Sequence, residues 1–294
     1  MRTPLRPCYA IVLVMAWFIL PGCKKIAERL EQDPDEIGKF CKIDTFSFGS
    51  APAYQQRMQV SYNSNGDPVT EVPLTSFLFG NAFDNTFFRY DKYHRLVDLF
   101  YVFPDYDPTF GFSTGDIDLW YRFTYPAPGI VIDSFFNYDG PGIPPVANPP
   151  SDYTVLTVSR YQQDEQGRTI KTDVKVISSL GTSTSSFYTE YDRKGNKVVP
   201  GAVYDDKINI YRANKNWQLI FQDYSQNNRI LPAAGNFPAS IVSYDKWGLP
   251  LLLTTNGAQG TLPFFNGIFP PGTDMSVSYS CDGAASKQQS FSAP

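Results

Sequence analysis

The chain has 294 residues, of which 42% are hydrophobic and only 18% are charged. Its formal net charge of −4 offers no basic surface of the kind that binds nucleic acid, so that class of partner is excluded. Aromatic residues make up 16% of the chain, and 24 prolines with 21 glycines interrupt it too often for long helices. This composition favours an all-β fold. The length allows one large domain or two smaller ones, and we predict a single domain.

The first 22 residues have the pattern of a signal peptide. Arg2 and Arg6 precede an unbroken apolar run from Ala10 to Leu20. That run is too short to span a bilayer, but it suits the core of a signal peptide. Cys23 then follows Leu20-Pro21-Gly22.

This segment resembles the signal of bacterial lipoproteins, in which leucine stands three residues before a lipidated cysteine and a small residue stands directly before it. The resemblance implies that residues 1–22 are removed and that Cys23 carries acyl chains. The alternative is an ordinary secretory signal, or a short anchor, that ends in cysteine. Two or more acyl chains attach a protein to a membrane durably, because each buried CH₂ contributes about 0.8 kcal/mol. The membrane is therefore an expected partner, through the lipid at the N-terminus.

The expected location is the outer membrane of a Gram-negative bacterium. Lys24-Lys25 follows Cys23 in place of the acidic cluster found in similar lipoproteins of Bacteroidota that are exported to the surface. The periplasmic face is therefore favoured over the cell surface. Residues 23–39 are polar and charged, and we expect them to form a flexible tether.

Two cysteines, Cys41 and Cys281, remain in the predicted domain of residues 40–294. In an oxidising compartment they could form a disulfide that closes a loop of about 240 residues. The alternative is two separately buried thiols. No second Cys or His lies at ligand spacing from either residue, so we predict neither a metal site nor a cofactor.

A short polar turn recurs along this domain. Its clearest copy is Tyr191-Asp192-Arg193-Lys194-Gly195. Further copies begin at Tyr62, Tyr90, Tyr224 and Tyr244, another is Asp164-Glu165-Gln166-Gly167-Arg168, and a weaker one begins at Tyr125. In each copy an Asp or Asn side chain can accept a backbone N–H of its own turn, and Gly, Asn or His in the fifth place tolerates positive φ. His94, the single histidine of the chain, holds that fifth place, which predicts a structural role for it and not a catalytic one.

The tyrosine, the acidic or amide residue and the glycine resemble the YD hairpin repeats of Rhs-type shell proteins, and similar hairpins occur in uncharacterised lipoproteins of Bacteroidota. About seven hairpins give about fourteen strands, and a sheet of that length must curl, close or split into layers. The predicted fold is an all-β antiparallel meander of about fourteen strands built from YD-like hairpins. It would be curled or closed into a barrel-like or two-layer sheet.

Two groups of residues could bind a ligand. The aromatic group could stack on a glycan or contact an envelope protein, although filling the core would also explain it; its members are Phe110, Phe112, Trp120, Phe264 and Phe265. The acidic group, Asp105 with Asp107 and Asp116 with Asp118, could perform acid and base chemistry or bind Ca²⁺. Solvation of a loop explains the same acidic residues without a site.

We therefore predict a membrane-anchored lipoprotein of the cell envelope that acts as a binding or scaffolding module for a glycan or a protein. The alternative is a carbohydrate-active or other hydrolase that uses the paired aspartates, and a third possibility is a subunit of a secretion or assembly machine. A hydrolase requires a pocket with two convergent carboxyl groups. Function is expected in the long loops around Phe110, Pro144 and Phe265 and not at the turns.

Overall fold

The computed structural model describes residues 41–49, 56–74, 85–102, 117–138, 153–231, 237–238, 240–255, 260–261, 264 and 272–281. Ten strands come first, namely β1 (Cys41–Phe48), β2 (Gln56–Tyr62), β3 (Pro68–Pro73), β4 (Asn85–Tyr90), β5 (Leu96–Val102), β6 (Ile117–Ala127), β7 (Ile130–Asn137), β8 (Val155–Gln163), β9 (Thr169–Ser178) and β10 (Gly181–Tyr188). Each of these strands pairs with the next in an antiparallel meander.

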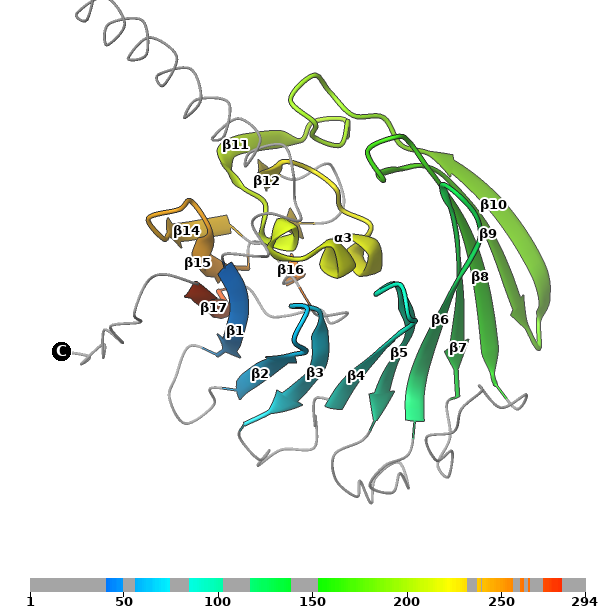
Figure 1. The fold of residues 1–294 in the computed structure, drawn as a ribbon. Helices are drawn as coiled ribbons and strands as arrows, with labels where there is room; N and C mark the ends of the chain where they lie inside the picture. Colours follow the sequence, from blue (N-terminus) through cyan, green and yellow to red (C-terminus); the bar gives the residue numbers. More distant parts are fainter. Residues whose placement is uncertain are drawn as a thin grey trace, which may run out of the picture.

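Three later strands extend this sheet beyond β1. They are β17 (Asp274–Cys281), β15 (Pro250–Thr254) and β14 (Ser240–Tyr244), and they give a sheet of thirteen strands whose two edges are β10 and β14. The sheet curls into an open arc (Figure 1). The prediction of an all-β, curled antiparallel sheet is thus confirmed, although the strand order departs from a simple meander after β10.

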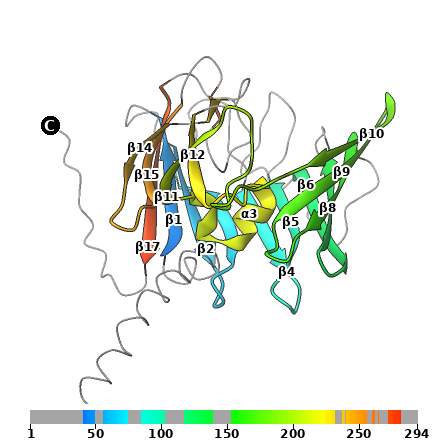
Figure 2. The ribbon, with the colours of Figure 1, turned by 90° about the horizontal axis from the view of Figure 1, so that it is seen from above.

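Between β10 and β14 the chain leaves the sheet and enters its concave side (Figures 1 and 2). This segment contains β11 (Val203–Ile208), the 3₁₀ helix η2 (Ile210–Ala213), the α-helix α3 (Lys215–Phe221) and β12 (Asn227–Leu231). Strands β11 and β12 pair with each other, and β13 (Phe237–Pro238) pairs with β16 (Gly260–Thr261). The helices of this segment pack against core residues of β1, β2, β4 and β5.

Two asparagines begin the two helices. The side chain of Asn209 accepts the N–H of Tyr211 at the start of η2, and that of Asn214 accepts the N–H of Asn216 at the start of α3. Asparagine is among the best N-cap residues because its side-chain oxygen satisfies an N–H that has no partner within the helix. The Asn214 side chain also donates to the carbonyl oxygen of Gly66, which ties the helix to the turn between β2 and β3.

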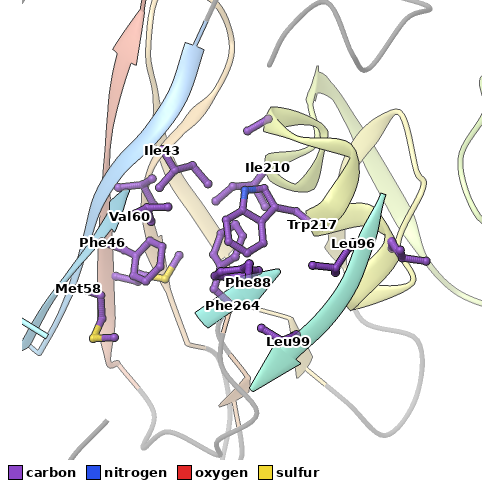
Figure 3. Close-up of a cluster of buried hydrophobic side chains, with 14 of the residues drawn as sticks. Ile43, Phe46, Met58, Val60, Phe88, Leu96, Leu99, Ile210, Trp217 and Phe264 are labelled. Carbon is purple, nitrogen blue, oxygen red and sulfur yellow. The ribbon is translucent and has the colours of Figure 1, made fainter. Parts of the chain in front are cut away.

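The main hydrophobic core lies between the concave face of the sheet and these helices (Figure 3). Trp217 of α3 is 1% exposed and lies at its centre. Its ring meets Phe88 edge-on at 5.5 Å and Phe264 at 5.2 Å. Burying a large apolar side chain contributes about 1.5–3 kcal/mol, so the helix stabilises the part of the curled sheet against which it packs.

A second hydrophobic cluster forms a row across four neighbouring strands, β4 to β7. Phe87, Phe100, Trp120 and Phe136 are successive cross-strand partners. Trp120 is fully buried there, and its indole N–H donates to Asp98. Cross-strand aromatic pairs of this kind contribute about 0.2–1 kcal/mol each. The aromatic side chains of the chain therefore fill hydrophobic clusters on both faces of these strands.

Candidate functional site

Five turns share one local geometry, and they begin at Asn63, Asp91, Asp164, Asp192 and Asp245. In each of them Oδ1 of the first residue accepts the backbone N–H groups two and four residues later, at 2.8–3.1 Å. The fourth residue has a φ between 59° and 84°. The repeat is counted from the residue before this Asp or Asn, so the fourth residue of the turn is the fifth place of the repeat. The positive φ predicted for that place is confirmed in these five turns, His94 included.

The prediction of a further copy of this turn at Tyr224 is wrong. Asn228, its fifth residue, lies inside β12 and is not among the residues with positive φ. Its side chain accepts the N–H of Ile210 and donates to the carbonyl oxygen of Ile208. The asparagines here hold the corner between β11 and η2, because the chain arrives from helix α3 and not from a strand.

Three tyrosines of the repeat, together with Tyr279 of β17, form a ladder of hydrogen bonds. Four hydroxyl groups donate to the carbonyl oxygen of the first residue of a neighbouring strand, at 2.6–3.1 Å; the pairs are Tyr90 with Pro68, Tyr125 with Leu96, Tyr191 with Thr169, and Tyr279 with Pro250. Burial raises the pKa of each of these tyrosines well above its ordinary value. The hydroxyl groups therefore stay protonated and link each hairpin to another.

Because the five turns follow strands that run in the same direction, they gather at one side of the sheet, where these strands end. We call this side, which is distinct from the edge strands β10 and β14, the turn edge. A cavity of about 1180 Å³ opens there. Its walls come from the Asp192 turn beyond β10, from the Asp245 turn after β14, and from residues 205–212 between them. The cavity thus lies where the chain between the two edge strands, β10 and β14, connects one side of the open sheet with the other.

The lining of this cavity is strongly charged. Six side chains are cationic, namely Arg168, Arg193, Lys194, Lys207, Arg212 and Lys246, and four are carboxylates, namely Asp192, Asp205, Asp206 and Asp245. The lining also contains Trp247, which is 56% exposed. A concave site with polar groups at fixed positions is the usual form of a small-molecule site.

The carboxylates of the lining are occupied by contacts within the protein. Asp192 and Asp245 accept the N–H groups of their own turns. Asp205 accepts the N–H groups of Lys207 and Asn228 and the hydroxyl of Tyr244. A hydrogen bond from Lys207 lowers the pKa of Asp206.

Several cationic side chains of the lining form no ion pair with a carboxylate of the described residues. Among the residues that the structure describes, no carboxylate oxygen lies within 4.0 Å of the charged nitrogens of Arg193, Lys194 or Lys246. By contrast, Arg168 is held by Asp164 at 2.7 Å and stacks on Tyr191. With six cationic side chains and four carboxylates, the net charge of the lining is positive.

A smaller cavity of about 340 Å³ adjoins the first one and shares Gln166, Gln218 and Tyr224 with it. His94 and Arg95 of the second turn line it as well, together with Lys215 of α3. The Nδ1 of His94 lies 3.0 Å from the side-chain amide of Asn65, so the imidazole links two neighbouring turns. Both cavities are thus bounded by turn residues and by helix α3.

Two aromatic residues proposed as ligand contacts prove to be core residues. Trp120 is fully buried, and Phe264 is 6% exposed with its ring stacked on Phe46 at 5.3 Å. Neither has an exposed face for a glycan or a partner, since cross-strand aromatics cover the first and the Trp217 cluster covers the second. Phe110, Phe112 and Phe265 lie outside the described residues.

Of the paired aspartates, Asp118 alone lies within the described residues; Asp105, Asp107 and Asp116 lie outside them. Asp118 is half-buried near the start of β6, whereas the turn edge is reached at the other end of this strand. At about 3.3 Å per residue the two places are about 30 Å apart along the strand. The cavity and this carboxylate therefore do not form one site.

Two buried carboxyl groups have raised pKa values, and neither lines the cavity. Burial raises the pKa of Glu71 to about 8 and that of Asp133 to about 7. Asp133 accepts a hydrogen bond from the hydroxyl of Tyr161 at 3.3 Å. In the described ranges, no three His, Cys, Asp or Glu side chains come together as a metal site requires.

The two cysteines of the domain form a disulfide. Cys41 and Cys281 are direct partners in the register of β1 and β17. The bond therefore joins the first and the last described strands, 240 residues apart in the chain. Cys23 lies outside the described residues, as do the rest of the predicted signal and the tether.

Comparison of the sequence with models of protein families gives no match, and comparison with curated proteins gives none either. Within the described part of the chain, none of the helices has the length and apolar character needed to cross a membrane.

Proposed function

We propose that this chain is a lipid-anchored binding module of the bacterial cell envelope and that it holds its ligand in the cavity at the turn edge. The observation that carries the proposal is the cavity itself, with a volume of about 1180 Å³ and a charged lining drawn from both edges of the open sheet. The sequence around Cys23 supports attachment to the outer membrane, with the periplasmic face preferred.

The walls of the cavity are fixed before any ligand binds. Asn196 and Asn227 bind each other reciprocally, because the N–H of Asn227 donates to Oδ1 of Asn196 and the Asn196 amide donates back. These bonds hold the Asp192 turn against β12. The 2.5 Å hydrogen bond from Tyr244 to Asp205 holds β14 against β11. A preformed site avoids part of the entropic cost of binding.

Site-specific photo-crosslinking tests the position of the ligand site. A photoreactive amino acid is placed at Trp247, in the cavity, and in a second variant at Lys175, which is exposed on β9 and is not part of the cavity lining. We expect adducts with envelope components from position 247 and not from position 175. The same adducts from both positions, or none from position 247, would contradict the proposal.

Metabolic labelling with an alkyne analogue of palmitate tests the anchor separately. The wild-type protein should take up the label and sediment with membranes, and the Cys23→Ser variant should do neither. Labelling that persists in the variant would show that the acyl chains are attached elsewhere.

A further inference from the structure

We propose that the ligand of the turn-edge cavity is an anionic saccharide, a sugar chain that carries carboxylate or phosphate groups. This inference rests on the proposed function, because it takes the cavity to be the place where the ligand binds. It adds the chemical class of the ligand and the residues that select it.

The charge balance of the cavity favours an anion. All four carboxylates of the lining are engaged by backbone N–H groups, by a hydroxyl or by Lys207. In the described part of the chain, Arg193, Lys194 and Lys246 have no carboxylate within 4.0 Å. Six cationic side chains against four carboxylates leave the lining with a net charge of +2, and a ligand that entered would meet this positive charge. Bonds between such cations and carboxylate or phosphate oxygens are about twice as strong as neutral hydrogen bonds.

The turn positions themselves present these cations. Arg193 and Lys194 are the two central residues of one turn, and Lys246 and Trp247 are the two central residues of another. All four side chains are exposed. Because backbone bonds to Asp192 and Asp245 fix each turn, the four side chains emerge from fixed backbone positions in two separate turns of the lining. They can therefore contact one ligand from both turns.

Trp247 favours a saccharide over a simple anion. Its side chain is 56% exposed, and the Nζ of Lys246 lies 4.9 Å from the centre of its ring system. A flat aromatic ring next to a cation can pack against the C–H face of a sugar ring while the cation binds an acidic substituent. Trp120 and Trp217 are buried, so Trp247 is the one tryptophan of the described residues that is free for such a contact.

The size and polarity of the cavity agree with a chain of sugars. Small-molecule pockets usually measure about 300–1,000 Å³, and this cavity reaches about 1180 Å³. Beside its charged groups, the lining contains the amides of Gln166 and Gln226, which can bind hydroxyl groups, and few apolar side chains. An acyl chain would find no continuous apolar surface in it.

Quenching of tryptophan fluorescence by acrylamide gives a direct test on the mature full-length protein in detergent. Trp17 belongs to the segment that we expect to be removed, so quenching reports on Trp247. The probes are a trimer of galacturonic acid, a trimer of galactose as its neutral counterpart, mannose 6-phosphate, and inorganic phosphate alone. Variants Lys194→Glu and Trp247→Phe alter the cavity, and Lys175→Glu is the matched charge reversal outside it.

We expect the acidic trimer or the sugar phosphate to protect Trp247 and to bind at least tenfold more tightly than the neutral trimer. Lys194→Glu should weaken that binding at least tenfold, as should raising NaCl from 50 to 500 mM, because both reduce the attraction between cation and anion. Lys175→Glu should bind like the wild type. Trp247→Phe should lose the signal, and calorimetry then measures the affinity of this variant. Whichever anionic probe binds more tightly identifies the acidic group as carboxylate or phosphate.

Failure of this inference can be told apart from failure of the proposed function. If the neutral trimer binds as tightly as the acidic one, or if no saccharide binds while crosslinking from position 247 still captures a partner, the ligand class is wrong and the cavity remains the site. If inorganic phosphate alone reproduces the affinity, the saccharide part is wrong. If an acidic saccharide binds equally well to the wild type and to Lys194→Glu, the cavity is not its site and this inference is wrong; the proposed function fails as well only if position 247 gives no crosslink.

Discussion

Glu71 offers the sharpest test of how this sheet is stabilised. It lies on β3 between its cross-strand partners Val60 and Thr86. Its side chain is 7% exposed, and Oε1 has no hydrogen-bond partner. The neutral substitution Glu71→Gln keeps the shape of the side chain and removes the ionisable group.

The effect of this substitution on stability depends on pH. Burial raises the pKa of Glu71 from 4.5 to about 8, so between these two pH values the folded protein keeps a proton that the unfolded chain loses. The free energy of unfolding of the wild type therefore falls as pH rises, by about 1.4 kcal/mol per pH unit for this group. Between pH 5 and pH 7 the loss is about 3 kcal/mol. The glutamine side chain of the variant does not titrate, so the variant escapes this loss.

Urea unfolding of both proteins at pH 5, 6 and 7 measures the effect. The variant and the wild type should be similarly stable at pH 5, and the variant should be about 3 kcal/mol more stable at pH 7. Asp133 titrates in both proteins, so its contribution cancels in the difference. Glu190→Gln, at an exposed residue, is the control and should show no trend. A stability difference between Glu71→Gln and the wild type that stays constant across this range would refute the reasoning.

Three further substitutions test the covalent bond, the turns and the tyrosine ladder. Cys41→Ser opens a disulfide whose cysteines are 240 residues apart, and it should destabilise the fold by up to about 5 kcal/mol because the unfolded chain gains freedom. Gly195→Ala should cost more than about 1 kcal/mol, since φ is +81° and the new Cβ would lie 2.6 Å from a glutamine side chain. Tyr90→Phe should cost about 1–2 kcal/mol because it removes the bond to the carbonyl oxygen of Pro68, whereas Tyr93→Phe, at a 64% exposed residue, should cost almost nothing.

Chemical denaturation measures all three, and each has its own contrary result. Equal stability of Cys41→Ser and the wild type without reductant would mean that the bond adds nothing. An unchanged midpoint for Gly195→Ala would show that the turn accepts a Cβ. An equal loss of unfolding free energy for Tyr90→Phe and Tyr93→Phe would show that the hydrogen-bond ladder does not stabilise the fold.

The turns could be predicted from sequence because their chemistry is local. An Asp or Asn followed three residues later by Gly or His defines both the side-chain acceptor and the position of positive φ, and Asp192 with Gly195 shows both features. The curled antiparallel sheet follows from the number of such hairpins. The copy at Tyr224 departs from this pattern, because Ser225 stands in the place of the Asp or Asn and Asn228 in the place of the Gly or His. Helix α3 also precedes it, so the strand that a hairpin needs is missing.

Helix α3 was missed, although a short signal for it exists. Asn214 is a good N-cap, and Trp217, Ile220 and Phe221 have the spacing of one helical face. Seven residues carry too little of that period to stand out in a chain rich in strands. The burial of Trp120 and Phe264 could not be predicted, because a residue's exposure depends on which neighbours the tertiary fold brings to it.

The cavity could have been inferred in part. Turns that follow strands of one direction must gather at one edge, so the central residues of the repeats, Arg193 with Lys194 and Lys246 with Trp247, could have been expected to lie near each other. What sequence does not reveal is that the chain crosses from β10 to β14 and brings these two turns to the same cavity. The expectation that the turns have no part in function is replaced here by a proposal that they form the site, while the long loops around Phe110, Pro144 and Phe265 lie outside the described residues.

The most direct test of the proposed site is hydrogen exchange of the mature protein with and without the galacturonic acid trimer. The proposal predicts slower exchange of backbone N–H groups in the Asp192 and Asp245 turns, with no change in the turn that begins at Asn63, which has the same geometry but does not line the larger cavity. Protection confined to the Asn63 turn or to strands away from the turn edge would contradict it.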